Sequence, residues 1–110
     1  MTTDRTREAQ MYARVTTYRI KTGTAEAIAE IAREGLLPIL QGMPGFVRYG
    51  VAAVGDGTVL SISMWSDRAN AEAAVVAAAD FVATDLADHI SLITNAVGDL
   101  IFYEGVPVAV

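Results

Sequence analysis

Apolar and polar residues alternate along residues 11–20, MYARVTTYRI, where β-branched and aromatic side chains are frequent. This period of two predicts a strand, because successive side chains of a strand point to opposite faces of a sheet. One face carries Met11, Ala13, Val15 and Thr17, and the other carries Tyr12, Arg14, Thr16 and Tyr18. The second face therefore combines aromatic rings with hydroxyl groups and one guanidinium group.

After Gly23 the apolar period changes to that of a helix. The positions that show this period are Ile28, Ile31, Ala32, Leu36, Ile39 and Leu40. Thr24 is suited to the N-cap and Glu26 to the first turn, where a carboxylate interacts favourably with the helix dipole. Gly35 and Pro38 are expected to kink or split the helix, because Pro38 cannot donate to the carbonyl four residues earlier.

Two further strand-like runs, residues 46–54 and 58–65, flank Gly55-Asp56-Gly57. Glycine permits the positive φ that a tight hairpin needs, so the two strands are expected to pair antiparallel. Both runs carry apolar residues on both faces. The expected sets are Val47, Val51 and Ala53 against Phe46 and Val54, and Leu60, Ile62 and Met64 against Val59.

The rest of the chain predicts a second helix and a last strand. Ser66 or Asp67 is expected to cap an alanine-rich helix that reaches about Ala79. Residues 90–103 are expected to form the strand, with a bulge near Gly98-Asp99. A further helical turn between the two is indicated by the spacing of Val82, Leu86 and Ile90.

The order β-α-β-β-α-β predicts a ferredoxin-like α+β fold, a four-stranded antiparallel sheet with both helices on one face. Residues 11–104 would form this domain, between an N-terminal flexible arm of residues 1–10 and a C-terminal tail of residues 105–110. The other face of the sheet needs a cover, since 53% of the residues are hydrophobic and a small domain has little interior. We therefore expect a homodimer.

Charge and cysteine content exclude several classes of protein. Eight basic against 13 acidic residues give a formal net charge of −5, so nucleic acid and anionic membranes are not expected as partners. The lack of cysteine excludes a disulfide framework, a thiolate nucleophile and cysteine-based metal sites. It also fits a reducing compartment. Since the first ten residues lack the apolar stretch of a secretory signal, a cytoplasmic protein is expected.

Three short motifs resemble those of a known family. They are Met43-Pro44-Gly45-Phe46, Gly55-Asp56-Gly57-Thr58 and Ser63-Met64-Trp65-Ser66-Asp67. In order and spacing they resemble the antibiotic biosynthesis monooxygenase family of dimeric α+β barrels, over about residues 11–104. The resemblance implies two ferredoxin-like subunits packed sheet to sheet, with a pocket in each subunit between the sheet and its helices.

The family includes cofactor-independent monooxygenases of polycyclic aromatic polyketides and haem-degrading enzymes. In the first branch the family tryptophan, matched by Trp65, has an Asn four residues before it and a Tyr six residues after it, where this chain has Ser61 and Ala71. In the second branch an Asn on the first strand and a His correspond to Thr16 and Ala74. The chain thus keeps the tryptophan without these companions.

The family tryptophan faces its pocket, so the resemblance places Trp65 and the serines two and four residues before it on the helix side of the sheet. If Thr16 faces the same way, the polar face of the first strand joins them in an apolar pocket with a few convergent polar groups, as small-molecule sites have. Trp65 can alternatively be a packed aromatic at a strand end. The predicted substrate-binding residues are Tyr12, Thr16, Ser61, Ser63 and Trp65.

The predicted catalytic residues are Arg14, Tyr18 and His89. Arg14 would hold a substrate oxyanion, or would pair with a surface carboxylate. Tyr18, like Tyr12, would relay a proton or only pack. His89, the only histidine, would shuttle a proton, or would cap the second helical segment at its C-terminal end. No histidine pair at metal-ligand spacing is present, so we expect neither a metal nor a cofactor.

Two hypotheses follow. In the first, the chain is a cofactor-independent monooxygenase of an electron-rich aromatic or quinol-like small molecule, which reduces dioxygen itself once it is deprotonated, and Trp65 stacks on its ring. In the second, the chain is a non-catalytic small-molecule-binding protein of the same dimeric fold, because Ser61 and Ala71 replace the Asn and Tyr of the oxidising branch. Haem degradation is less favoured, since Ala74 stands at the family's histidine position.

Overall fold

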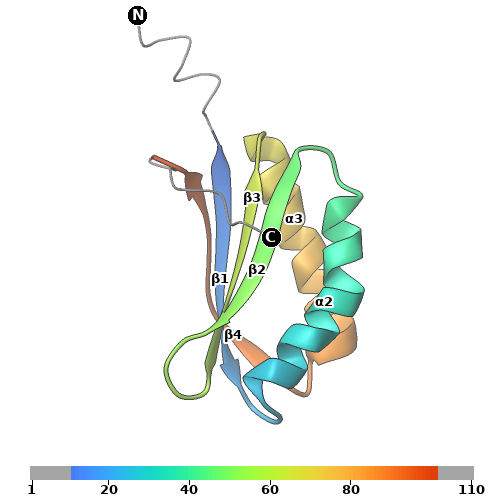
Figure 1. Ribbon diagram of the computed structural model, residues 1–110, viewed down its shortest axis with the longest axis vertical. Coiled ribbons are helices and arrows are strands. Elements are labelled where there is room, and N and C mark those ends of the chain that lie inside the picture. The colour runs from blue at the N-terminus through green and yellow to red at the C-terminus, as the bar shows by residue number, and fades with distance from the viewer. Residues whose placement is uncertain (1–10, 102–110) are drawn as a thin grey trace, which may run out of the picture.

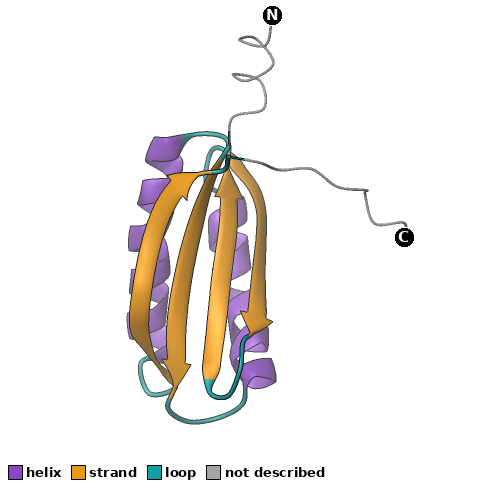
Figure 2. Cartoon of the chain, turned by 90° about the vertical axis from the view of Figure 1, so that its left-hand side faces the viewer, coloured by secondary structure: helices purple, strands orange, loops and turns teal. Residues whose placement is uncertain are grey.

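Four antiparallel strands and two long helices make up residues 11–101, the part of the chain that the computed structural model describes. The elements are β1 (Tyr12–Ile20), α2 (Ala25–Gln41), β2 (Phe46–Ala53), β3 (Thr58–Trp65), α3 (Arg68–Phe81), the π-helix η1 (Val82–Leu86) and β4 (Ile90–Asp99). The strand order is β2-β3-β1-β4, and both helices cover the same face of the sheet (Figure 1). Figure 2 shows the opposite face, which none of the described helices or strands covers. The predicted ferredoxin-like fold is confirmed, and the predicted arm and tail lie outside the described residues.

The sequence predicted a kink or a split at Gly35 and Pro38, and helix α2 runs through both residues without being split. Thr24 caps it as expected, and its Oγ1 accepts from the Ala27 N–H at 3.1 Å. Pro38 is exposed in the last turn, where water can bond the carbonyl that lacks its N–H partner. At the C-cap, the Gly42 N–H donates to the carbonyls of Pro38 and Ile39, which ends the helix.

The second helical segment is longer than predicted. Asp67 is the N-cap of α3, since its Oδ1 accepts from the N–H groups of Ala69 at 2.7 Å and Asn70 at 3.4 Å. The helix continues to Phe81, and the expected further turn is the π-helix η1, which buries Leu86. The alanines that α3 buries, Ala71, Ala74 and Ala78, have short side chains and let the helix approach the sheet closely.

Strand β4 contains an irregularity, although not where the sequence suggested. Tyr18 pairs with Leu92 and Thr17 with Thr94, so Ile93 is an extra residue opposite β1. Gly98 pairs regularly with Ala13, so the predicted bulge at Gly98 is wrong. The strand ends at Asp99, and residues 102 and 103 of the expected strand lie outside the described part.

Strand β2 carries a second irregularity at its start. Phe46 pairs with Trp65 and Arg48 with Met64, which leaves Val47 as the extra residue. Phe46 therefore packs on the helix side together with Tyr49 and Val51, not on the face opposite Val51 as expected. An extra residue in a strand reverses the alternation of faces beyond it, which explains the difference.

The core lies between the sheet and the two helices. It includes Leu36 and Leu40 of α2, Trp65 of β3, and Phe81 of α3, all buried. Among residues 11–101, no helix is both long and apolar enough to cross a membrane.

Gly35 is the position where α2 and α3 come together. A Cβ on this residue would lie 2.7 Å from Cζ of Phe81 and closer still to Cε1. Carbon atoms in contact are normally about 3.5–4.0 Å apart. The ring of Phe81, which is 6% exposed, therefore occupies the space that any larger side chain would need.

We expect Gly35→Ala to lower the free energy of unfolding by about 1 kcal/mol, because overpacking costs roughly 1–3 kcal/mol and the better helix propensity of alanine offsets about 1 kcal/mol of this cost. Urea denaturation measures this change. Gly42→Ala is the matched control, since a Cβ there meets its nearest atoms at 3.6 Å and its φ is −80°. In a Phe81→Leu background the cost of Gly35→Ala should disappear. An unchanged stability in the wild-type background would show that the ring of Phe81 moves aside freely.

Candidate functional site

Arg14 is fully buried beneath the helices, and three hydroxyl groups hold its guanidinium group. Its Nε donates to Ser63 Oγ at 2.9 Å, Nη1 to Thr16 Oγ1 at 2.7 Å, and Nη2 to Ser61 Oγ at 3.1 Å. These residues are neighbours by strand register, since Arg14 pairs with Ser63 and Thr16 with Ser61. The guanidinium group is therefore fixed against the sheet by the two central strands.

A third strand extends the same network. Thr16 pairs with Asn95 of β4, and the Thr16 hydroxyl donates to Asn95 Oδ1 at 2.7 Å. Because the amide oxygen of Asn95 accepts this bond, the NH₂ group of Asn95 takes no part in it and keeps its two donors for other partners. Asn95 is exposed and lines the cavity described next.

A cavity of about 280 Å³ opens beside Arg14, between α3 with η1 and the strands β1 and β4. Its polar lining residues are Arg14, Thr16, Tyr18 and Asn95, and its apolar lining residues are Val75, Ala78, Ala79, Val82, Ala83, Ala87 and Leu92. This volume is near the lower end of small-molecule sites, which span about 300–1,000 Å³. The polar residues all lie on the strands, so a bound molecule would meet polar groups on one side and an apolar wall on the other.

The charge of Arg14 has no anionic partner in the described part of the chain. The ion pairs within residues 11–101 join Arg33 to Glu30, and Arg68 to Glu72 and Asp99. Burial lowers the pKa of Arg14 and nearby tyrosines oppose this shift, yet an arginine stays protonated at neutral pH. A buried cation without a counterion is unfavourable, so an anionic group in the cavity would be stabilised.

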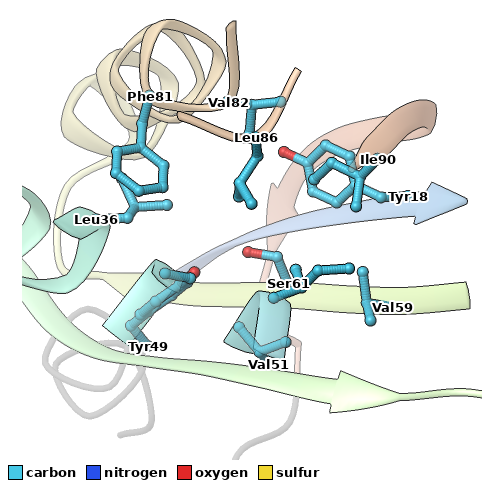
Figure 3. Close-up of a pocket in the computed structure, with 12 residues that line it drawn as sticks. Tyr18, Leu36, Tyr49, Val51, Val59, Ser61, Phe81, Val82, Leu86 and Ile90 are labelled. Carbon is cyan, nitrogen blue, oxygen red and sulfur yellow. The ribbon is translucent and has the colours of Figure 1, made fainter. Parts of the chain in front are cut away.

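A second, much smaller cavity of about 20 Å³ lies between the sheet and the helices, deeper in the core (Figure 3). Tyr18 and Val82 line both cavities. Burial raises the pKa of Tyr18 and of Tyr49, an effect that the charge of Arg14 opposes at both residues. Both tyrosines are therefore neutral phenols near pH 7, able to donate a hydrogen bond.

Trp65 lies on the helix side of the sheet, as expected, in the packed position that the alternative interpretation gave it and not in a cavity wall. Trp65 is 0% exposed and belongs to the core, and it lines neither cavity. Its Nε1 donates to Ser63 Oγ at 2.8 Å, and its ring meets the ring of Phe46 edge to face, with centroids 5.5 Å apart. Trp65 thus contacts the site through Ser63, which accepts from both Trp65 and Arg14.

The structure brings together most of the predicted site residues, namely Arg14, Thr16, Tyr18, Ser61 and Ser63. Tyr12 is half-buried and packs against the core without lining either cavity. Ala71 and Ala74, at the family positions of a tyrosine and a histidine, are fully buried in α3.

His89 lies apart from the site residues around Arg14. It lies between η1 and β4. Its backbone N–H donates to the Leu86 carbonyl, and its backbone carbonyl accepts from the backbone N–H groups of Lys21 and Thr22. It lines neither cavity, and its Nδ1 is buried without a hydrogen-bond partner. Its predicted part in proton transfer therefore has no support from the geometry around Arg14.

Sequence reasoning missed two polar residues of the site, Tyr49 and Asn95. The alternation of β2 from Tyr49 onward was a signal for the first, since Tyr49 and Val51 share a face. For Asn95 the sequence held no comparable signal, because its facing depends on the register between β1 and β4. Within residues 11–101, no group of three or more metal-ligating side chains is present.

Comparisons with known proteins agree with the observed fold. Residues 11–79 match the family model of the antibiotic biosynthesis monooxygenases. No curated protein matches the chain in sequence.

Three solved structures illustrate the similarity in fold. SnoaB, a cofactor-independent oxygenase from Streptomyces nogalater, is 22% identical with a TM-score of 0.60, over 90% of this chain and 99% of SnoaB. The NE2512 protein of unknown function from Nitrosomonas europaea is 17% identical with a TM-score of 0.65, over 91% and 97% of the two chains. MupZ from Pseudomonas fluorescens is 16% identical with a TM-score of 0.64, over 79% and 69%. These neighbours share the fold, and the family match over most of the domain shows that the chain belongs to the antibiotic biosynthesis monooxygenase family.

Proposed function

We propose that the protein is a cofactor-independent monooxygenase that binds an electron-rich aromatic or quinol-like molecule in the larger cavity. The observation that carries this proposal is the fully buried guanidinium group of Arg14, which no carboxylate within residues 11–101 neutralises. Such a group favours the phenolate or enolate form of a ligand over its neutral form. The fold similarity to SnoaB, a cofactor-independent oxygenase, supports the same reaction type.

The chemistry needs no further redox partner. The ionised substrate donates electrons to dioxygen, and a peroxide forms at a ring carbon. For an activated methylene, loss of water from this peroxide leaves a carbonyl, so that R₂CH₂ and O₂ give R₂C=O and H₂O. The substrate carbon is oxidised by four electrons, and dioxygen is reduced by four.

The chain's own groups bind, orient and desolvate the substrate. Arg14, which lines the cavity, would hold the substrate oxyanion, and the apolar residues of α3 and η1 would exclude water from the ring. Tyr18 stays neutral because burial raises its pKa, so it is suited to donate a proton or a hydrogen bond to reduced oxygen. The described lining residues include no carboxylate or imidazole, so the proton of the substrate leaves to solvent through the open side of the cavity.

This lack of a general base among the described lining residues also favours a second candidate, a protein that binds such a molecule without oxidising it. The two functions share the location and the anionic character of the ligand. They differ in whether dioxygen is consumed.

Arg14→Met is expected to slow oxygen uptake with a hydroxyanthrone about 10²- to 10³-fold, the usual effect of removing one group that stabilises an oxyanion. An oxygen electrode measures the rate, and circular dichroism verifies folding. Arg19→Met is the matched control, because Arg19 lies on the same strand but is exposed. Binding is followed by the fluorescence of Trp65, the only tryptophan, which shares Ser63 with Arg14. Ligand binding without any oxygen uptake by the wild type would establish the second candidate instead.

We further propose that two copies pack through the uncovered face of the sheet. The side chains on this face are mostly apolar and include Ala13, Val15, Leu60, Ile62, Met64 and Ala96. A face of this kind is normally covered in solution, and a second copy offers a matching surface.

Light scattering at micromolar concentration should therefore give about twice the chain mass of 11.6 kDa. Ile62→Lys, at the centre of the face, should give a monomer or abolish folding, because it places a charge in the interface. Ile39→Lys is the control, since Ile39 lies on α2 and is 46% exposed. A well-folded wild-type monomer would refute this assembly.

A further inference from the structure

The smaller cavity has no part in the reaction as described so far. Figure 3 shows the hydroxyl groups of Tyr49 and Ser61 on one side of it and the side chains of Phe81 and Leu86 across from them, with the ring and hydroxyl group of Tyr18 beside Leu86. It lies directly behind Tyr18, whose side chain separates it from the larger cavity.

Its volume admits one very small molecule. About 10–15 Å³ is enough for a single water molecule, and this cavity measures about 20 Å³. An aromatic ring does not fit. The occupant is therefore a molecule of two or three atoms.

The lining favours an apolar occupant over water. Nine of the 12 lining residues are apolar. The three others carry hydroxyl groups, but Nδ1 of His89 is the one buried side-chain N or O atom in residues 11–101 that lacks a hydrogen-bond partner. Ser61 Oγ already accepts from Arg14 Nη2, and most of the lining is hydrocarbon. Small cavities with a mainly apolar lining stay dry and accept gases such as xenon.

We propose that this cavity is a binding site for dioxygen, adjacent to the site of the organic substrate. The inference rests on the proposed monooxygenase function, which consumes dioxygen beside Tyr18. Dioxygen is apolar and diatomic, so it matches both the volume and the lining. Tyr18 and Val82 form the wall that it crosses to reach the substrate anion at Arg14.

Two matched substitutions test the assignment. Ala32 lines only the smaller cavity and Ala78 only the larger one, and both are buried alanines of a helix, 4% and 2% exposed. Ala32→Val should lower kcat/KM for dioxygen about threefold or more and leave KM for the organic substrate unchanged, because it removes binding of one reactant only. Ala78→Val should raise KM for the organic substrate. Val59→Ile fills the smaller cavity from the sheet and replaces Ala32→Val if that variant does not fold.

Xenon provides a readout that does not depend on activity. A wild-type crystal under xenon pressure should show one xenon atom between Tyr49, Leu36 and Phe81, and an Ala32→Val crystal should show none. Loss of xenon with an unchanged kcat/KM for dioxygen would overturn the inference and leave the proposed function intact. An ordered water in place of xenon would also overturn it. A wild type that consumes no oxygen with any substrate would refute the proposed function, and the dioxygen site with it.

Discussion

The burial of one positive charge without a counterion sets the requirements that the site has to meet. Arg14 is 0% exposed, and its immediate partners are three neutral hydroxyl groups. Hydroxyl groups satisfy the donors of a guanidinium group but leave its charge in place, so the desolvation cost is only partly offset. The residues at positions 16, 61 and 63 are small, and their hydroxyl groups are the partners of the guanidinium group. This buried charge lowers the stability of the folded state relative to an apolar residue at the same position. It also favours an anion over a neutral molecule in the adjacent cavity.

Trp65 contributes to this arrangement from inside the core. Its indole N–H and the Arg14 Nε share the two lone pairs of Ser63 Oγ, so the position of one donor constrains the other. The edge-to-face contact with Phe46 in turn fixes the indole ring. Trp65 thus supports Arg14, which lines the larger cavity, and does not line that cavity itself.

Regular alternation made much of the site predictable. The strands β1 and β3 pair without interruption, so alternation grouped the polar residues of β1 and the two serines of β3 correctly on each strand, and the family resemblance indicated that the two groups share one side of the sheet. The two residues that were missed, Tyr49 and Asn95, lie on strands that each contain an extra residue, Val47 or Ile93. A single sequence does not show where such a residue lies, because its position is settled by pairing with a distant strand. Likewise, the split expected at Gly35 and Pro38 did not form, since packing against Phe81 and solvent access at Pro38 outweighed local preference.

The extra residue in β4 determines which side chains of that strand line the larger cavity. Leu92 and Asn95 are three positions apart and would face opposite sides of a regular strand, yet both line the cavity. Deletion of one residue at this point would exchange the set of side chains on that wall while Arg14 stayed in place on β1. The shape of the cavity therefore depends on the register of β4, whereas its positive charge depends on the single side chain of Arg14. An insertion or deletion in β4 would therefore change the outline of the cavity without any substitution at Arg14.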